Sequence, residues 1–283
     1  MTILLVILHA TMVVALGLGL FAVGHLLLSS LLRPARLRDE LFLKDNPAIG
    51  IVVAGYDLGL VLSFGSVLSG ESRGWLADLA QISGYGLGVI GIYYVFGWLG
   101  RSVVAWNLDP IRELTADRNA GLGSVLAGYY VASGLLLHGA LAGQGGGWGA
   151  TLVFLGLAQA CLLAVGPVYG WIAGFHLRDQ LRRDNVAAGV AYGGALVGIG
   201  IILGQLLSSD FTTWGESLAG FASYAVGGLV GLPVVRWLAD LFLAPGVRLS
   251  REIASGDAGP NLAAGLLEAV TYVAAGLLVA WSL

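Results

Sequence analysis

The chain has 283 residues, of which 57% are hydrophobic and only 11% are charged, and its mean hydropathy is +0.85. A soluble domain has about a quarter of its residues charged, so this composition excludes an ordinary soluble protein. The net charge of −3 and the pI near 5.7 give no sign of nucleic-acid binding. The single cysteine, Cys161, cannot form an intrachain disulfide.

Eight apolar segments follow one another along the chain. Each is long enough to cross a hydrocarbon core of ~30 Å, which takes about 20 residues. In chain order they cover residues 3–32, 47–69, 79–106, 120–142, 148–176, 186–208, 216–243 and 262–283. The first runs too long for a signal peptide and lacks a basic start, so we expect a retained membrane helix. The predicted fold is an all-α polytopic membrane bundle, with eight transmembrane helices as four parallel-repeat hairpins.

The basic residues are distributed very unevenly between the two sides of the predicted bundle. Thirteen of the fourteen lysines and arginines end the odd-numbered segments or follow them, and only Arg73 lies on the other side. Loops rich in lysine and arginine stay in the cytoplasm. We therefore expect the odd-to-even loops to be cytoplasmic and both termini to lie outside.

A short motif recurs at each cytoplasmic turn. Asparagine is followed four residues later by glycine in DNPAIG (45–50), RNAGLG (118–123), DNVAAG (184–189) and PNLAAG (260–265). An asparagine side chain can accept from the free N–H groups of the next helical turn, which predicts four N-caps. These caps are Asn46, Asn119, Asn185 and Asn261. Small-xxx-small spacings, such as Gly55 with Gly59 and Gly194 with Gly198, predict close helix packing.

Upstream of each asparagine lies a second shared element, as in LRDEL (37–41) and LRDQL (177–181). A long helix, a proline, an acidic residue before Leu or Ile, and Asn-x-Ala-Ala-Gly together resemble the bacterial inner-membrane family called domain of unknown function 350, of UPF0719 type. The second half matches better, because the first half has NPAIG and NAGLG instead. The resemblance implies two tandem four-helix domains, residues 1–143 and 147–283, in a multi-pass protein of the bacterial inner membrane. It implies no reaction.

Two acidic residues are predicted to lie inside the membrane. Asp57 comes eleven residues after Asn46, about 16 Å along the helix, and Glu268 comes seven after Asn261, about 10 Å along. No lysine or arginine is expected at a comparable depth to pair with either. The same register carries further polar residues: Tyr56, Tyr129, Tyr130, Tyr192 and Tyr272. Such groups can form interhelical hydrogen bonds, line an ion or proton path, or bind a lipid or small solute.

Three long side chains occupy equivalent positions in the repeat. His25, Arg101 and Arg236 each stand nine residues before their unit's proline, near the predicted cytoplasmic interface. We expect such side chains to extend to the headgroups, and binding of anionic lipid is the alternative. The arginines predicted to face a cytoplasmic partner or lipid are Arg38, Arg101, Arg112, Arg178, Arg236 and Arg251.

The sequence contains no phosphate-binding loop, no metal-ligand pair and no catalytic triad, so we predict a non-enzymatic protein without cofactor or metal. Two functional hypotheses remain. The first is a membrane scaffold or sensor that recruits a peripheral cytoplasmic protein. The alternative is a proton or cation channel or transporter that uses Asp57 and Glu268 near an axis between the four hairpins. The expected partners are the bilayer, anionic lipid, a cytoplasmic peripheral protein and a second copy of the chain, with no nucleic acid.

Overall fold

The computed structural model describes residues 3–70, 72–101, 108–255 and 259–282, and these residues form an all-helical bundle. Eight helices of these described residues are long and apolar enough to cross a membrane, which confirms the predicted all-α polytopic membrane bundle. They are α1 (Ile3–Leu31), α3 (Pro47–Ser63), α5 (Trp75–Leu99), α7 (Ala120–Ala142), α8 (Gly147–Ala173), α10 (Val186–Leu207), α11 (Trp214–Leu238) and α13 (Leu262–Ser282). Short segments extend two of them: α4 (Gly65–Leu68) follows α3, and the π-helix η2 (Ala239–Leu243) follows α11.

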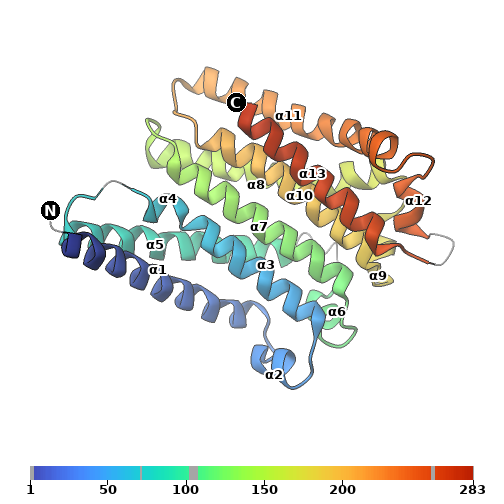
Figure 1. The fold of residues 1–283 in the computed structure, drawn as a ribbon, viewed down its shortest axis with the longest axis horizontal. Coiled ribbons are helices and arrows are strands. Elements are labelled where there is room, and N and C mark those ends of the chain that lie inside the picture. Colours follow the sequence, from blue (N-terminus) through green and yellow to red (C-terminus); the bar gives the residue numbers. More distant parts are fainter. Residues whose placement is uncertain (1–2, 71, 102–107, 256–258, 283) are drawn as a thin grey trace.

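Four short helices lie together at one end of the bundle, and both termini lie at the other end (Figure 1). They are α2 (Leu37–Phe42), α6 (Pro110–Thr115), α9 (Leu177–Arg182) and α12 (Leu249–Ala254), and we call this the short-helix end. The chain turns sharply between three of these helices and the next membrane helix, because Asp45, Arg118 and Asp184 have φ angles of 47°, 52° and 53°. Each of these residues directly precedes a capping asparagine.

The four membrane helices that leave the short-helix end form a single row, in the order α3, α7, α10, α13 (Figure 1). Glycine makes this close packing sterically feasible. A Cβ added to Gly128 of α7 would lie 2.5 Å from the Cα of Gly193 in α10. One added to Gly194 of α10 would lie 2.4 Å from the Cα of Ala269 in α13. The predicted role of small residues in helix approach is confirmed at these joints.

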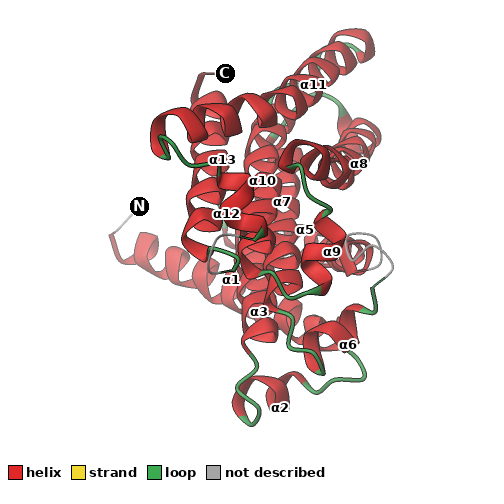
Figure 2. Ribbon diagram, turned by 90° about the vertical axis from the view of Figure 1, so that its right-hand side faces the viewer, coloured by secondary structure: helices red, strands yellow, loops and turns green. Residues whose placement is uncertain are grey.

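The other four membrane helices cover the row. Helix α5 packs on α3 and α7, α8 packs on α7 and α10, and α11 packs on α10 and α13, while α1 packs on α3 and α5 at the end of the row (Figure 2). The two inner helices of the row, α7 and α10, are the most buried spans. The described residues of α3 and α13 are not closely packed together. The repeat therefore builds an open row and not a ring of hairpins around an axis.

Candidate functional site

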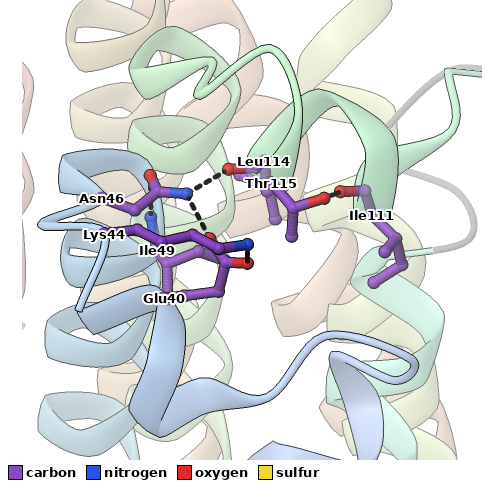
Figure 3. Close-up of polar contacts among 7 residues, drawn as sticks. All are labelled: Glu40, Lys44, Asn46, Ile49, Ile111, Leu114 and Thr115. Carbon is purple, nitrogen blue, oxygen red and sulfur yellow. Dashed lines mark hydrogen bonds and ion pairs between the residues drawn. The ribbon is translucent and has the colours of Figure 1, made fainter. Parts of the chain in front are cut away.

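Each of the four repeat units, numbered in chain order, consists of a covering helix, a short helix and a helix of the row. Asn46, at the start of α3, joins the first two units. Its Oδ1 accepts from the backbone N–H groups of Ala48 and Ile49, at 3.1 and 3.4 Å, which caps α3 (Figure 3). Its Nδ2 donates to Glu40 of its own short helix at 3.0 Å and to the carbonyl of Leu114 in α6 at 2.9 Å. Asn46 is 3% exposed. One buried amide thus fixes a membrane helix, its own short helix and the short helix of the following unit.

The same joint recurs along the row. Asn119 caps α7 through the N–H of Leu122 at 2.7 Å, and its Nδ2 donates to Glu113 at 2.9 Å and to the Leu181 carbonyl of α9 at 2.6 Å. Asn185 makes the equivalent set of bonds with Ala188, Gln180 and the Ile253 carbonyl of α12. Three amides thereby link all four short helices into one strip.

The last asparagine differs from the other three. Asn261 is exposed, accepts from Ala264 N–H at 3.3 Å and donates to Glu252 of its own unit at 3.2 Å. Among the described residues, no carbonyl of a following unit receives its amide, because α13 ends the row. The end of the repeat is therefore visible in its hydrogen bonds.

Glu40, beside the first joint, is an almost fully buried carboxyl at the surface of the bundle. Burial acts to raise its pKa, but hydrogen bonds from Lys44 and Asn46 and the charges of Lys44 and Arg118 outweigh burial. The pKa of Glu40 consequently lies below its ordinary value, and the carboxylate form is favoured. Lys44 Nζ lies 2.6 Å from Glu40 Oε1. Figure 3 marks this ion pair with a dashed line.

The strip presents an exposed arginine at the second or third residue of each of the four short helices. The side chain that accepts from the asparagine of the same unit follows one or two residues after each arginine. This acceptor is a glutamate in α2, α6 and α12 and a glutamine in α9. These arginines are Arg38, Arg112, Arg178 and Arg251. Arg112 also lies 3.6 Å from Asp117, in an exposed ion pair that contributes little to stability.

Inside the membrane region, the structure pairs Glu268 of α13 with Arg236 of α11. Arg236 Nη1 lies 3.1 Å from Glu268 Oε1, and the two side chains are 6% and 1% exposed. The hydroxyl of Tyr169 donates to the same Oε1 at 2.9 Å, and Arg236 Nη2 donates to Ser250 of α12 at 2.9 Å. The second carboxylate oxygen of Glu268 and the hydroxyl of Tyr272 are buried without a hydrogen-bond partner among the described residues.

The expectation that Glu268 has no basic partner is therefore wrong, and so is the prediction that Arg236 faces lipid. Counting residues along each helix separately placed Arg236 nearer the interface than Glu268. The packing of α11 against α13 brings their side chains together instead. Arg101, its equivalent just after the end of α5, is half-buried and donates to the backbone carbonyl of Leu31 in α1. Neither arginine extends freely to the headgroups.

Asp57 of α3 pairs with a histidine. His25 Nδ1 lies 3.0 Å from both carboxylate oxygens, and the two side chains remain 36% and 21% exposed at the edge of the bundle. Asp57 and Glu268 thus lie at opposite ends of the row, on α3 and α13, each in contact with the covering helix of its own unit. The structure does not bring them into one site.

The tyrosines predicted at mid-membrane divide between two clusters. Around α3, the rings of Tyr56 and Tyr130 are 5.4 Å apart, and the hydroxyl of Tyr93 donates to both of their backbone carbonyls at 3.0 Å. Tyr129 donates to Gln159 of α8, whose amide donates to Ser133. These contacts join helices through hydrogen bonds.

The second cluster surrounds the Arg236–Glu268 pair. Tyr169 of α8 lies 5.3 Å from Tyr192 and 6.2 Å from Tyr272, measured between ring centroids. A groove of about 350 Å³ between α10, α11 and α13 reaches Tyr272 and is otherwise largely apolar. No three His, Cys, Asp or Glu side chains of the described residues lie close enough together to hold a metal ion.

Sequence reasoning missed His25 and Arg236 as partners of the acids, as well as Tyr93, Tyr169 and Gln159. The repeat alignment contained the signal for the first two. His25 and Arg236 occupy equivalent positions in units 1 and 4, the two units that carry an intramembrane acid. A polar residue that recurs at this position in the two units with an acid is evidence that it pairs with the acid. The predicted depth of His25 and Arg236 in the membrane did not indicate this pairing.

Comparison with known proteins agrees with this repeat. The family described as Domain of Unknown Function (DUF350) matches residues 2–141 and again residues 144–283. A curated relative from Aquifex aeolicus (strain VF5), named UPF0719 transmembrane protein, is 22% identical over 254 residues, which covers 86% of this chain and 88% of its own. Neither description names a reaction, and no solved structure matches the chain. The chain is a multi-pass membrane protein that belongs to the DUF350 family and carries two tandem copies of its domain.

Proposed function

We propose that the protein is a non-enzymatic membrane scaffold that captures a peripheral protein through its short-helix end, with this end in the cytoplasm of the inner membrane. The observation that carries the proposal is the strip of four short helices locked together by Asn46, Asn119 and Asn185. Each short helix presents an exposed arginine at its second or third residue. A rigid row of like charges is suited to recognising an acidic surface.

The rigidity of the strip matters more than the number of charges. An exposed ion pair contributes only about 0–1 kcal/mol, because side-chain ordering and screening offset the attraction. Several arginines held on one surface act together, since the first contact makes the others nearly intramolecular. They also speed the encounter with a partner of opposite charge. The same row would attract anionic headgroups, at about 1 kcal/mol for each arginine near the membrane surface.

The test replaces Arg38, Arg112, Arg178 and Arg251 together with glutamine. The matched control replaces four other exposed arginines of the same end, Arg36, Arg182, Arg183 and Arg248, and so removes equal charge. Cross-linking in native membranes, with identification of the linked protein, should show a peripheral protein that the first variant loses and the control retains. Equal capture by both variants contradicts the proposal, as does loss of bound anionic lipid without any protein.

A proton or cation path is the second candidate, and the His25–Asp57 pair favours it. This pair combines two titratable groups at 3.0 Å inside the membrane region, on a part of α3 that remains partly exposed. Glu268 supports the alternative less well, because Arg236 already neutralises it in a buried pair. Flux of protons and cations into proteoliposomes should fall in Asp57→Asn if this candidate holds. Equal flux in the natural protein, Asp57→Asn and Glu268→Gln argues against it.

A further inference from the structure

The three joints in the row of α3, α7, α10 and α13 follow one contact rule. We number each helix from its capping asparagine as position 0. At the first joint Gly55 (+9) meets Ala127 (+8), and at the last Gly194 (+9) meets Ala269 (+8). At the middle joint Gly128 (+9) meets Gly193 (+8). Each helix therefore has a leading face, which meets the next helix, and a trailing face, which meets the previous one.

Other positions obey the same rule. The +4 glycine of each following helix meets the backbone of position +2 in the helix before it: Gly123 meets Ala48, Gly189 meets Gly121, and Gly265 meets Ala187. A Cβ at these three glycines would lie 2.8, 2.1 and 2.4 Å from that backbone. The +4 glycine is thus required wherever a preceding helix is present.

Helix α3 carries the same +4 glycine, although it is the first helix of the row and has no earlier row helix to contact. A Cβ at Gly50 (+4) would meet no atom within 4 Å. Two other residues of this trailing face, Ala54 (+8) and Val61 (+15), are exposed, whereas Asp57 (+11) is half-buried in its contact with His25 of α1. The leading face of α13 is open as well, with Ala263 (+2), Val270 (+9) and Ala274 (+13) all exposed. The two ends of the row are the two halves of the joint that the chain already makes three times.

The hydrogen bond that joins neighbouring units is also incomplete at the two ends of the row. Asn261 has the amide but meets no short helix of a following unit among the described residues. At the opposite end, Leu41 stands five residues before Asn46, as Leu114 stands before Asn119, and so carries the equivalent carbonyl. No asparagine side chain of the described residues donates to it. One end lacks an acceptor, and the other end lacks a donor.

At the α3 end of the row, the covering helix α1 is also less completely packed than the other covering helices. Helices α5, α8 and α11 each cover a groove between two helices of the row, whereas α1, among the described residues, packs closely on α3 and on no second helix of the row. Of its most apolar 18 residues only 6% are buried, against 33% for α5 and α8. A helix on the trailing face of α3 would give α1 the second helix that the other covering helices have.

We propose that this occupant is a second copy of the chain, joined head to tail, so that α13 of one copy packs on α3 of the next. The proposal goes beyond the scaffold function and does not depend on it. Asn261 of one copy donates to the Leu41 carbonyl of the next, and both copies keep the same orientation in the membrane. The contact joins two different faces and therefore propagates into a longer row or closes into a ring.

This joint is wider than the internal ones. Valine replaces glycine at Val270 (+9) and Val61 (+15), where the internal joints have Gly55, Gly128 and Gly194, and Gly134, Gly200 and Gly276. Their methyl groups keep the backbones of α13 and α3 further apart. The extra separation makes this contact weaker than an internal joint, and therefore reversible.

Cysteine cross-linking tests this geometry directly. In a Cys161→Ala background, Ala54→Cys and Val270→Cys place thiols at positions +8 and +9 of the proposed joint. A Cβ at Gly194 would lie 2.5 Å from the Cβ of Ala269 at the tight internal joint, so a wider joint approaches the ~3.8 Å that a disulfide needs. Mild oxidation of native membranes should give a ladder of dimers and larger species from the double variant. Each single variant should give no ladder, because a head-to-tail contact needs both faces.

The matched control pairs Ala54→Cys with Val230→Cys, an exposed residue of α11 away from the leading face of α13. A ladder from this pair equal to that from the Val270 pair overturns the proposal, as does the absence of a ladder from the Val270 pair. A cross-link as efficient in Ala54→Cys alone indicates a symmetric contact and also overturns it.

A second variant tests the contact without cysteine. Gly50→Leu adds a side chain where the isolated chain has open space, so folding should survive while association is blocked. Gly91→Leu makes the same change at an exposed glycine of α5 and serves as the control. Counting of subunits by single-molecule photobleaching should give single copies for Gly50→Leu and more for the control. The same count for both variants contradicts the proposed surface.

Discussion

The hydrogen bonds across the short-helix end predict a large difference between two chemically identical substitutions. Asn119→Ala removes a cap, a bond to Glu113 and a buried bond to the Leu181 carbonyl. Loss of a cap costs about 1 kcal/mol, and each further hydrogen bond costs about another 1 kcal/mol. We therefore expect Asn119→Ala to reduce the free energy of unfolding by about 3 kcal/mol. The Leu181 carbonyl would be left buried without its donor.

Asn261→Ala is the matched comparison. Asn261 also caps its helix and contacts its own short helix, but it is exposed and makes no bond to a following unit among the described residues. Water can replace the lost groups there, so the expected cost is about 1 kcal/mol. The predicted difference of about 2 kcal/mol measures the bond between units, together with the burial of the site.

The assay is equilibrium unfolding of the purified protein in mild detergent, at a dilution where single copies prevail, followed by circular dichroism and tryptophan fluorescence. Asn119→Asp separates the roles of the side chain, since the carboxylate still caps α7 but cannot donate to Glu113 or Leu181. It should therefore be nearly as unstable as Asn119→Ala. Equal costs for Asn119→Ala and Asn261→Ala would refute the view that the amide links repeat units.

Three further predictions follow from the packing and the charges. Glu268→Gln should destabilise the protein by about 3–5 kcal/mol in the same assay, because it leaves the buried Arg236 charge unpaired, and adding Arg236→Met should restore part of the loss. The pKa of Glu40 is lowered in the folded protein, so its contribution to stability is present above pH 4.5 and is lost as the pH falls through the lower folded pKa. In a pH series of unfolding measurements, Glu40→Gln should therefore lose less stability on acidification than the natural protein does. Gly128→Ala should cost about 1–3 kcal/mol, since its methyl group meets the α10 backbone, whereas Gly91→Ala should cost nothing.

The membrane helices could be predicted because each depends on local sequence. The boundary that differs most is the start of α5, which lies at Trp75 and not at the predicted residue 79, and the predicted end at 106 lies outside the described residues. The apolar blocks have the length of a bilayer, and a capping asparagine marks the start of each helix that leaves the short-helix end. The glycines also indicated close packing correctly, as the contacts of Gly55 and Gly194 show. All of these features can be recognised within one apolar segment and the turn that precedes it.

The lateral order of the helices could not be obtained in this way. Four similar hairpins fit equally well around an axis or along a line, and nothing within one hairpin decides between these arrangements. The contact of Arg236 with Glu268 depends on how α11 leans against α13, which residue counting does not give. The donor role of Asn46 was also missed, since its acceptor, the Leu114 carbonyl, is a backbone atom and has no sequence signature.

Because the joint between units is nearly uniform, the chain can be shortened or lengthened by one whole hairpin at a time. Each hairpin begins and ends on the side of the termini, so removing or duplicating one hairpin leaves the orientation of all the others unchanged. The +9 and +8 faces of the helices newly brought together would still be complementary, because the first three units carry glycine at +9 and every unit carries alanine or glycine at +8. A chain shortened by a middle hairpin should therefore insert and fold, whereas a cut between α2 and α3 would separate the amide of Asn46 from its acceptor Glu40.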